Sequence, residues 1–163
     1  MNNKKGFILL EILLAIAVIG AAFSLLLGIG TAAITFSGNA RRAAEMDFFI
    51  REELEAVRAF RDAASWSSGL GSVATGSNNP YYLFLNEGGP QPAWQLVPGI
   101  ETINNFSRKV IFDKVSRSPS TGNIEAVYNV ANNDPDTRKV TVIVSSPLKD
   151  YEVSTYLTNW QDD

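Results

Sequence analysis

Cysteine and histidine are both absent from the 163 residues of this chain. Without cysteine there is no disulfide and no thiolate metal site, and without histidine the most common general base and metal ligand are missing. The net charge is slightly negative, at −3, from 14 basic and 17 acidic side chains. Because nonspecific phosphate binding depends on clustered lysine and arginine, we expect no direct nucleic-acid binding.

Charge is also missing from one long stretch of the chain. Residues 12–40 are 29 consecutive residues without a charged side chain, whereas residues 41–163 hold nearly all of the charges. A chain of this length has room for one domain with a modest core and one accessory element. The sequence therefore predicts an apolar segment joined to a polar head.

A short basic leader precedes the apolar segment, with Lys4, Lys5 and Gly6 followed by Phe7 and, four residues later, Glu11. A secretory signal peptide has an apolar core of about 7–15 residues, and this segment is longer. A plain transmembrane anchor fits the length, since about 20 apolar residues cross a bilayer. It does not account for Glu11, because an ionisable residue in a spanning segment is costly and by default indicates function.

Residues 5–11, Lys-Gly-Phe-Ile-Leu-Leu-Glu, resemble the class III signal of type IV pilins and pseudopilins. The resemblance implies that a prepilin peptidase cleaves between Gly6 and Phe7 and methylates the new N-terminus at Phe7. It also implies that Glu11 is the family's glutamate, which pairs with the ammonium of a neighbouring subunit in a filament. A glycine allows close approach of the backbone to an active site, and Lys4 and Lys5 hold the leader on the cytoplasmic side.

Two explanations of Glu11 remain open from the sequence. Cleavage creates an α-ammonium at Phe7, one helical turn away, so the two charges can offset each other within a chain or between chains. In the simpler alternative, Glu11 lies near the membrane interface and is stabilised by the positive end of its own helix.

Hydrophobic periodicity predicts one long helix with two parts. Residues 7–40 form a transmembrane or filament-core part, and residues 41–64 form an amphipathic part. In the second part, apolar side chains recur every three or four residues and make one stripe: Met46, Ile50, Leu54, Val57 and Phe60. Pairs of opposite charge four residues apart, Asp47/Arg51 and Arg58/Asp62, support the helix modestly.

Residues 65–163 are predicted to form a head built on an antiparallel sheet. A loop rich in serine and glycine covers residues 65–79, and the apolar period then changes to two. The predicted strands are residues 81–85, 94–97, 106–115, 125–130, 139–145 and 151–157. The fold class is therefore α+β, with a long N-terminal helix whose amphipathic half packs on the sheet, and pilin heads resemble this arrangement.

Two acidic clusters are candidate sites. Asp134 and Asp136 are a weak calcium candidate, because calcium requires six to eight oxygen ligands and this segment offers few; an ordinary turn is favoured, and no cofactor is expected. Glu52 and Glu53 are interpreted as a solvated helix face. No set of nucleophile, base and orienting group is recognised, so enzymatic activity is not expected.

The sequence thus predicts a structural subunit, a minor pilin or pseudopilin, of a type IV pilus or a related secretion or DNA-uptake filament. The resemblance implies as partners a prepilin peptidase, other pilin subunits, an inner-membrane assembly platform and membrane lipid. Residues 1–6 would be a cleaved leader on a single-pass inner-membrane precursor with its head outside, later part of an extracellular or periplasmic filament. The alternative is a membrane-tethered extracytoplasmic binding module that does not polymerise and is not cleaved between Gly6 and Phe7.

Overall fold

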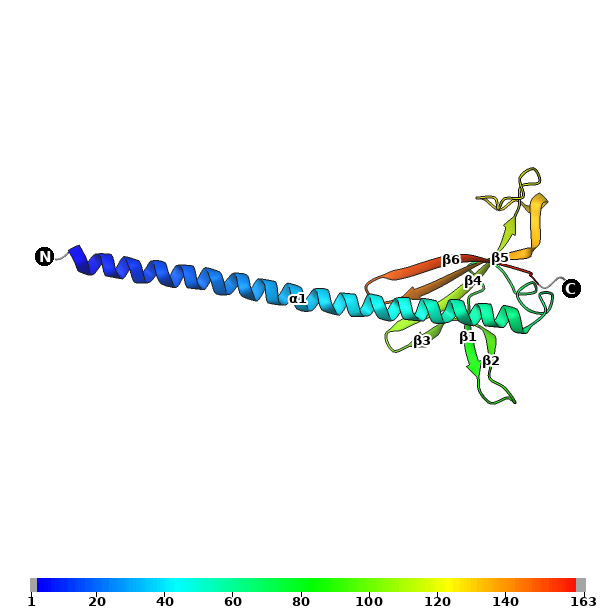
Figure 1. The fold of residues 1–163 in the computed structure, drawn as a ribbon, viewed down its shortest axis with the longest axis horizontal. Helices are drawn as coiled ribbons and strands as arrows, with labels where there is room; N and C mark the ends of the chain where they lie inside the picture. The colour runs from blue at the N-terminus through cyan, green and yellow to red at the C-terminus, as the bar shows by residue number, and fades with distance from the viewer. Residues whose placement is uncertain (1–2, 161–163) are drawn as a thin grey trace. The chain divides into compact units, whose positions relative to one another are not determined.

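The computed structural model describes the backbone of residues 3–160 and the side chains of residues 7–160. Among these residues it contains one α-helix, six strands and one 3₁₀ helix (Figure 1). The elements are α1 (Asn3–Ala63), β1 (Tyr81–Asn86), β2 (Ala93–Pro98), β3 (Glu101–Ile103), β4 (Phe106–Ser116), η1 (Val130–Asn132), β5 (Asn133–Ser145) and β6 (Asp150–Thr158). The chain divides into two compact units, Met1–Ala44 and Glu45–Asp163. The predicted α+β class is confirmed.

The first unit consists of the apolar part of α1. Every described side chain in residues 7–42 is exposed, on all sides of the helix. A helix that is apolar all round is typical of a segment buried in a membrane or a large core. The hydroxyls of Ser24, Thr31 and Thr35 donate hydrogen bonds to backbone carbonyls one turn earlier, at 2.9–3.0 Å. These hydroxyls are therefore satisfied without water.

The second unit begins with the amphipathic part of α1. Met46, Ile50 and Val57 are at most 4% exposed, while Leu54 and Phe60 are partly buried against the same core. The predicted apolar stripe is thus confirmed. It packs on one face of the sheet, because the other core side chains come mainly from β1, β4, β5 and β6. Burial of this stripe gives the head its hydrophobic core.

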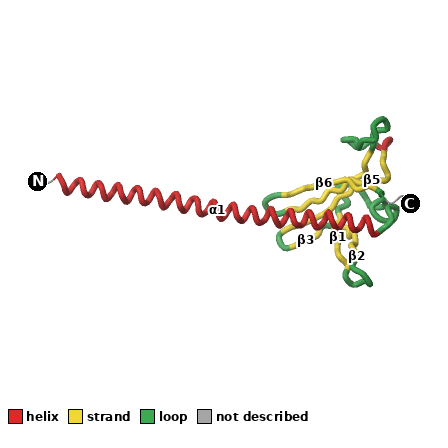
Figure 2. Tube along the Cα trace, in the orientation of Figure 1, coloured by secondary structure: helices red, strands yellow, loops and turns green. Residues whose placement is uncertain are grey.

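The sheet has the strand order β2-β1-β4-β5-β6, and all its pairs are antiparallel. Figure 2 shows its strands in yellow. β4 and β5 form its centre, where Val110 pairs with Val142 and Phe112 with Val140. All four side chains are fully buried. Successive strand residues point to opposite faces, so these four side chains, two residues apart on each strand, share the face of the sheet that packs on the helix.

The sheet splits along one edge of β4. β1 pairs with β4 only between Tyr81 and Val110, and the short strand β3 pairs with the earlier part of β4, from Arg108 to Phe106. Leu83, two residues beyond Tyr81, therefore has no strand partner on that side, and its N–H donates instead to a side chain of α1. Buried backbone donors must be paired, so the split needs such a partner.

The predicted strands are mostly confirmed, with three differences. The predicted strand at residues 125–130 is wrong, because the Asn129 side chain accepts a hydrogen bond from the Ala131 N–H and begins η1. Local capping by asparagine outweighs the apolar alternation there. β5 begins six residues before the predicted position, at Asn133. β3 was not predicted, since three residues give too short a pattern.

The connection between α1 and β1, residues 64–80, is irregular as predicted but is anchored at several points. Trp66 and Leu70 are 8% and 1% exposed and belong to the core. The Trp66 indole N–H donates to the carbonyl of Pro135 at 3.0 Å, and Arg138 donates to the carbonyl of Gly71 at 2.6 Å. A Cβ at Gly71 would lie 2.6 Å from the Trp66 carbonyl oxygen, so only glycine fits this turn.

Candidate functional site

The predicted processing and assembly residues all lie on α1. The backbone of Lys4, Lys5 and Gly6 belongs to the first turns of the helix, while Met1 and Asn2 of the predicted leader lie outside the described residues. Phe7 is 70% exposed, and Glu11, one turn later, is exposed as well. Residues four apart share a helix face, so the backbone places Glu11 beneath the position of the predicted new N-terminus.

The apolar segment that follows Glu11 meets the requirements of a membrane span. The helix Phe7–Ala63 contains a window that is long and apolar enough to cross a bilayer, and none of that window is buried within the chain. Its large side chains, from Phe7 to Phe36, are at least 54% exposed. This chain therefore carries an apolar surface that its own fold does not cover.

A second acidic position on α1 differs from its sequence interpretation. Glu53 is fully buried, so the prediction of a solvated face at Glu52 and Glu53 is wrong for Glu53. One carboxylate oxygen accepts the Leu83 N–H at 2.8 Å, and the other lies 3.3 Å from Nε of Arg108. The Glu53 side chain thus supplies the partner that the split in the sheet requires.

Arg108 collects three carboxylates at the split. Besides Glu53, its Nε donates to Glu101 on β3 at 2.5 Å and its Nη1 donates to Glu52 at 3.0 Å. The Arg108 side chain is only 7% exposed. The cluster therefore ties α1 to β1, β3 and β4 through charge-assisted hydrogen bonds, which are stronger than neutral ones.

The pKa of Glu53 reflects its burial among these charges. Burial, the largest cause, raises the pKa of Glu53 from 4.5 to about 7; the Arg108 charge and the Leu83 hydrogen bond oppose the rise, and Glu101 and Glu52 add to it. Around neutral pH, Glu53 is thus poised between its neutral and ionised forms.

The burial of Glu53 could have been predicted from its spacing. Glu53 lies three residues after Ile50 and four before Val57, and both of these belong to the apolar stripe. An acidic residue at a stripe position is buried when the stripe is buried, and it then needs a partner. Arg108 lies two residues before Val110 on β4, so the two side chains share the buried face of the sheet, where Arg108 also needs a partner.

The calcium candidate has a different role in the structure. Asp134 and Asp136 lie at the start of β5 and not in a turn, so the interpretation as a turn is wrong. Asp134 accepts hydrogen bonds from Arg117 at 2.5 Å and from Thr137 at 2.7 Å. Burial raises the pKa of Asp134, but the hydrogen bonds from Thr137 and Arg117 outweigh it, and the net shift is downward. Within the described residues, no three acidic side chains are grouped to hold a metal ion.

No protein-family model matches the sequence, and no curated protein or solved structure matches the chain.

Proposed function

We propose that this chain is a structural subunit of a filament of the type IV pilin and pseudopilin class. One observation carries the proposal: residues 12–40 form an uncharged helical stretch with every described side chain exposed, whereas the head has a complete core of its own. Apolar surface of this extent is strongly unfavourable in water. It needs lipid before assembly and neighbouring helices afterwards.

In this proposal, charge pairing sets the axial position of the α1 helix relative to the helices of neighbouring subunits. Moving an apolar helix from lipid into a bundle of apolar helices changes little hydrophobic free energy, because lipid tails and leucine side chains are equally apolar. An ionised group inside that environment is costly unless it is paired. The carboxylate of Glu11 would therefore select the position in which an ammonium, such as that of a processed Phe7 in a neighbouring subunit, lies beside it.

Location and partners follow from the same proposal. Lys4 and Lys5 would stay on the cytoplasmic side, in keeping with the positive-inside tendency, with the head on the opposite side of the membrane. Cleavage after Gly6 by a prepilin peptidase would release the leader. Other pilin subunits and an inner-membrane assembly platform would then incorporate the chain into an extracellular or periplasmic filament.

The first test is the mass of the N-terminal peptide in protein recovered from membranes and from sheared filaments of cells that make it. We expect a chain that starts at Phe7 with one added methyl group, present in both fractions. Gly6→Val should abolish cleavage. Gly20→Ala is the matched control, because a Cβ at Gly20 meets no atom within 4 Å, and it should be processed normally.

A second test separates processing from assembly. Glu11→Ala should be cleaved and methylated but lost from the sheared fraction, because the proposed pair to the ammonium is gone. Thr35→Val, which removes a hydroxyl of the same segment without touching a charge, should still assemble. A wild-type chain that keeps Met1 or Asn2 and stays in membranes would instead support a tethered binding module that does not polymerise.

A further inference from the structure

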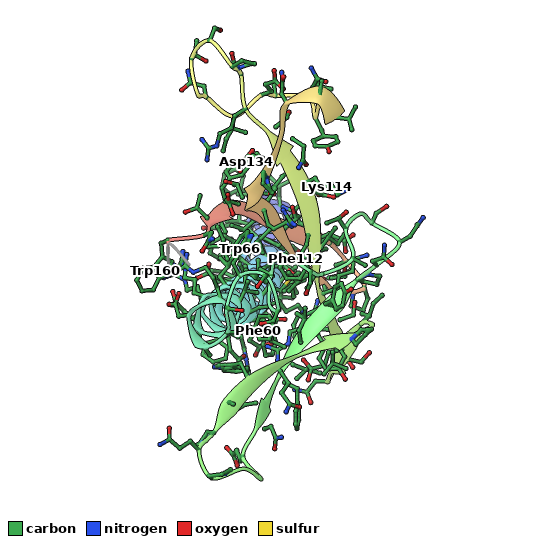
Figure 3. The ribbon with its side chains drawn as sticks, turned by 90° about the vertical axis from the view of Figure 1, so that its right-hand side faces the viewer. Phe60, Trp66, Phe112, Lys114, Asp134 and Trp160 are labelled. Carbon is green, nitrogen blue, oxygen red and sulfur yellow. The ribbon has the colours of Figure 1, made fainter. Side chains whose placement is uncertain are left out.

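β6 is the last strand on one side of the sheet, and its outer edge is free (Figure 1). Among the described residues, β6 pairs with β5 alone, over nine residues from Asp150 to Thr158. After the strand the chain turns to α1, where the Trp160 indole N–H donates to Asp62 at 3.1 Å (Figure 3). Asn159 and Trp160 thus leave the edge of β6 unpaired.

Hydrogen bonds at the two ends of the β5–β6 pair show which backbone groups face outward. The Ser146 N–H donates to the Lys149 carbonyl at 3.0 Å, and the Asn159 N–H donates to the Asp136 carbonyl at 2.8 Å. In an antiparallel pair, positions bonded to the neighbouring strand alternate with positions whose N–H and carbonyl point away from it. Both bonds give the same alternation, and the five outward-facing residues are all exposed: Asp150, Glu152, Ser154, Tyr156 and Thr158.

The opposite edge of the sheet, β2, is protected against pairing. The Gly99 N–H donates to the Pro80 carbonyl at 2.8 Å, so by the same alternation only Trp94, Leu96 and Pro98 face outward from β2. Pro98 has no N–H to offer. Proteins protect free edges with short strands, proline, lysine or bulges. β6 has nine residues, no proline, no lysine and no register shift against β5, so its edge is long, regular and open to a further strand.

The two faces of β6 define the side chains that suit an added strand. Tyr151 and Leu157 pack on the core below α1, and Val153, on the same face, is 40% exposed. Asp150 and Glu152 lie on the other face and are exposed, and the ion pairs found among the described residues include neither. Cross-strand neighbours interact on each face, so apolar residues fit beside Val153 and basic residues beside the two carboxylates.

We propose that the free edge of β6 binds an extended segment of a partner protein, which joins the sheet as a further antiparallel strand. The outward N–H and carbonyl groups of β6 supply the affinity, and an alternation of apolar and basic residues in the segment supplies the specificity. This site is separate from the proposed assembly role of α1, so either proposal can fail without the other.

A second copy of the chain suits this edge less well. A symmetric antiparallel pair of two β6 strands reverses the direction of one copy relative to the other, and with it the direction of α1. Two chains anchored in one membrane through α1 would point the same way. Self-pairing is therefore an outcome that the test must distinguish.

The test uses NMR on the full chain in detergent micelles, with the blocked synthetic peptide Thr-Val-Thr-Val-Thr-Val-Lys-Val-Lys as the probe. In antiparallel register its two lysines lie opposite Glu152 and Asp150, and its valines lie on the α1 face. We expect a Kd on the order of 100 μM. Hydrogen exchange at the amides of Glu152, Ser154 and Tyr156 should be fast in the free chain and at least about tenfold slower in the complex, since these amides gain a partner.

Two variants at one position separate backbone pairing from charge. Glu152→Pro removes an outward N–H but no bond to β5, a place where an edge strand tolerates proline, and should weaken binding by about tenfold. Glu152→Gln keeps the N–H and should weaken binding by only about twofold to threefold, because the ion pair is exposed. Unchanged amide shifts in β5 confirm that both variants are folded.

A matched peptide tests strand pairing from the other side. The same sequence N-methylated on its three threonines lacks N–H groups that face β6, and it should not bind. Equal binding by this peptide, equal binding by the Glu152→Pro variant, or no binding of the probe overturns the proposal. Slow exchange at Ser154 in the free chain at low concentration also overturns it, because the edge would then be covered. Dimers that form without peptide and are abolished by Glu152→Pro would assign the edge to a second copy and overturn the partner-protein proposal.

Discussion

The two parts of α1 have the same helical backbone but differ in the exposure of their apolar side chains. From Phe7 to Phe36 the large apolar side chains are exposed on every side, whereas Met46, Ile50 and Val57 are buried against the sheet. One glutamate from each part differs in the same way, since Glu11 is exposed and Glu53 is fully buried. A helix can thus be complete in hydrogen bonding while only one part of it has found its packing partners within the chain.

The difference indicates where free energy of folding is gained. The amphipathic part stabilises the head directly, because its stripe is removed from water when the head folds. The apolar part contributes nothing to that core, so its contacts must be judged in lipid or in an assembly. Substitutions in the two parts should therefore separate cleanly when head stability is measured.

The largest effect is expected from Arg108→Met, which removes the cationic partner of Glu52, Glu53 and Glu101. Arg108 lowers the pKa of Glu53, so without it Glu53 must either stay ionised and unpaired or take up a proton at pH 8, and the free energy of unfolding should fall by about 3–5 kcal/mol. The loss should be smaller at pH 5.5, where Glu53 takes up a proton. Denaturant unfolding of the full chain in micelles, followed by tryptophan fluorescence, measures both values. An equal loss at the two pH values would contradict this account of the cluster.

The next largest effect on head stability is expected from one of two isoleucine substitutions on α1. Ile50→Ala removes a side chain that is 4% exposed and should cost about 2–5 kcal/mol of head stability. Ile34→Ala removes one that is 75% exposed and should leave head unfolding unchanged. The same unfolding experiment measures both variants. Comparable losses from the two would mean that the apolar part does support the head.

The effect of pH on the free energy of unfolding of the head should be somewhat smaller than these two losses. The pKa of Glu53 is raised to about 7 in the folded chain from an ordinary value of 4.5, so its stabilising contribution is fully present below 4.5 and is lost as pH rises through about 7. The head should therefore gain on the order of 2 kcal/mol between pH 8 and pH 5.5. Glu53→Gln keeps an acceptor for the Leu83 N–H and should remove this dependence. A variant with the full wild-type pH profile would assign the titration to another group.

The smallest effect is expected from Arg51→Met. Arg51 pairs with Asp47 at 2.8 Å, as its spacing predicted, but the two side chains are 76% and 59% exposed. An exposed pair of this kind is worth less than about 0.5 kcal/mol, because water and salt screen it. The identical substitution at Arg108 thus gives a matched comparison of an exposed and a buried ion pair. A loss above about 1 kcal/mol would show that exposure is a poor guide here.

Much of the fold could be predicted because its patterns are local. The α1 stripe and the alternation in β4 and β6 depend on neighbouring residues, and so does the loop after α1. The split in the sheet could not be predicted, because it depends on two strands that share one edge of β4. The partner of Arg58 was also missed: it pairs with Glu55 and not with Asp62, since both acidic residues are within reach on the helix surface.

The candidate sites show the same difference between local patterns and tertiary contacts. Glu11 was recognised because a charge beside a long apolar run stands out in the sequence. The burial of Glu53 was not predicted, because two adjacent glutamates, Glu52 and Glu53, are typical of a solvent-exposed helix face.

The anchored connection after α1 has a consequence for proteolysis. Residues 64–80 contain no regular element, and a protease needs an extended, accessible stretch of backbone to cut. Trp66, Leu70 and the Arg138 hydrogen bond to Gly71 hold this backbone against the core. Cleavage at residues 66–71 should therefore require unfolding of the head, and its rate should report the fraction of open molecules.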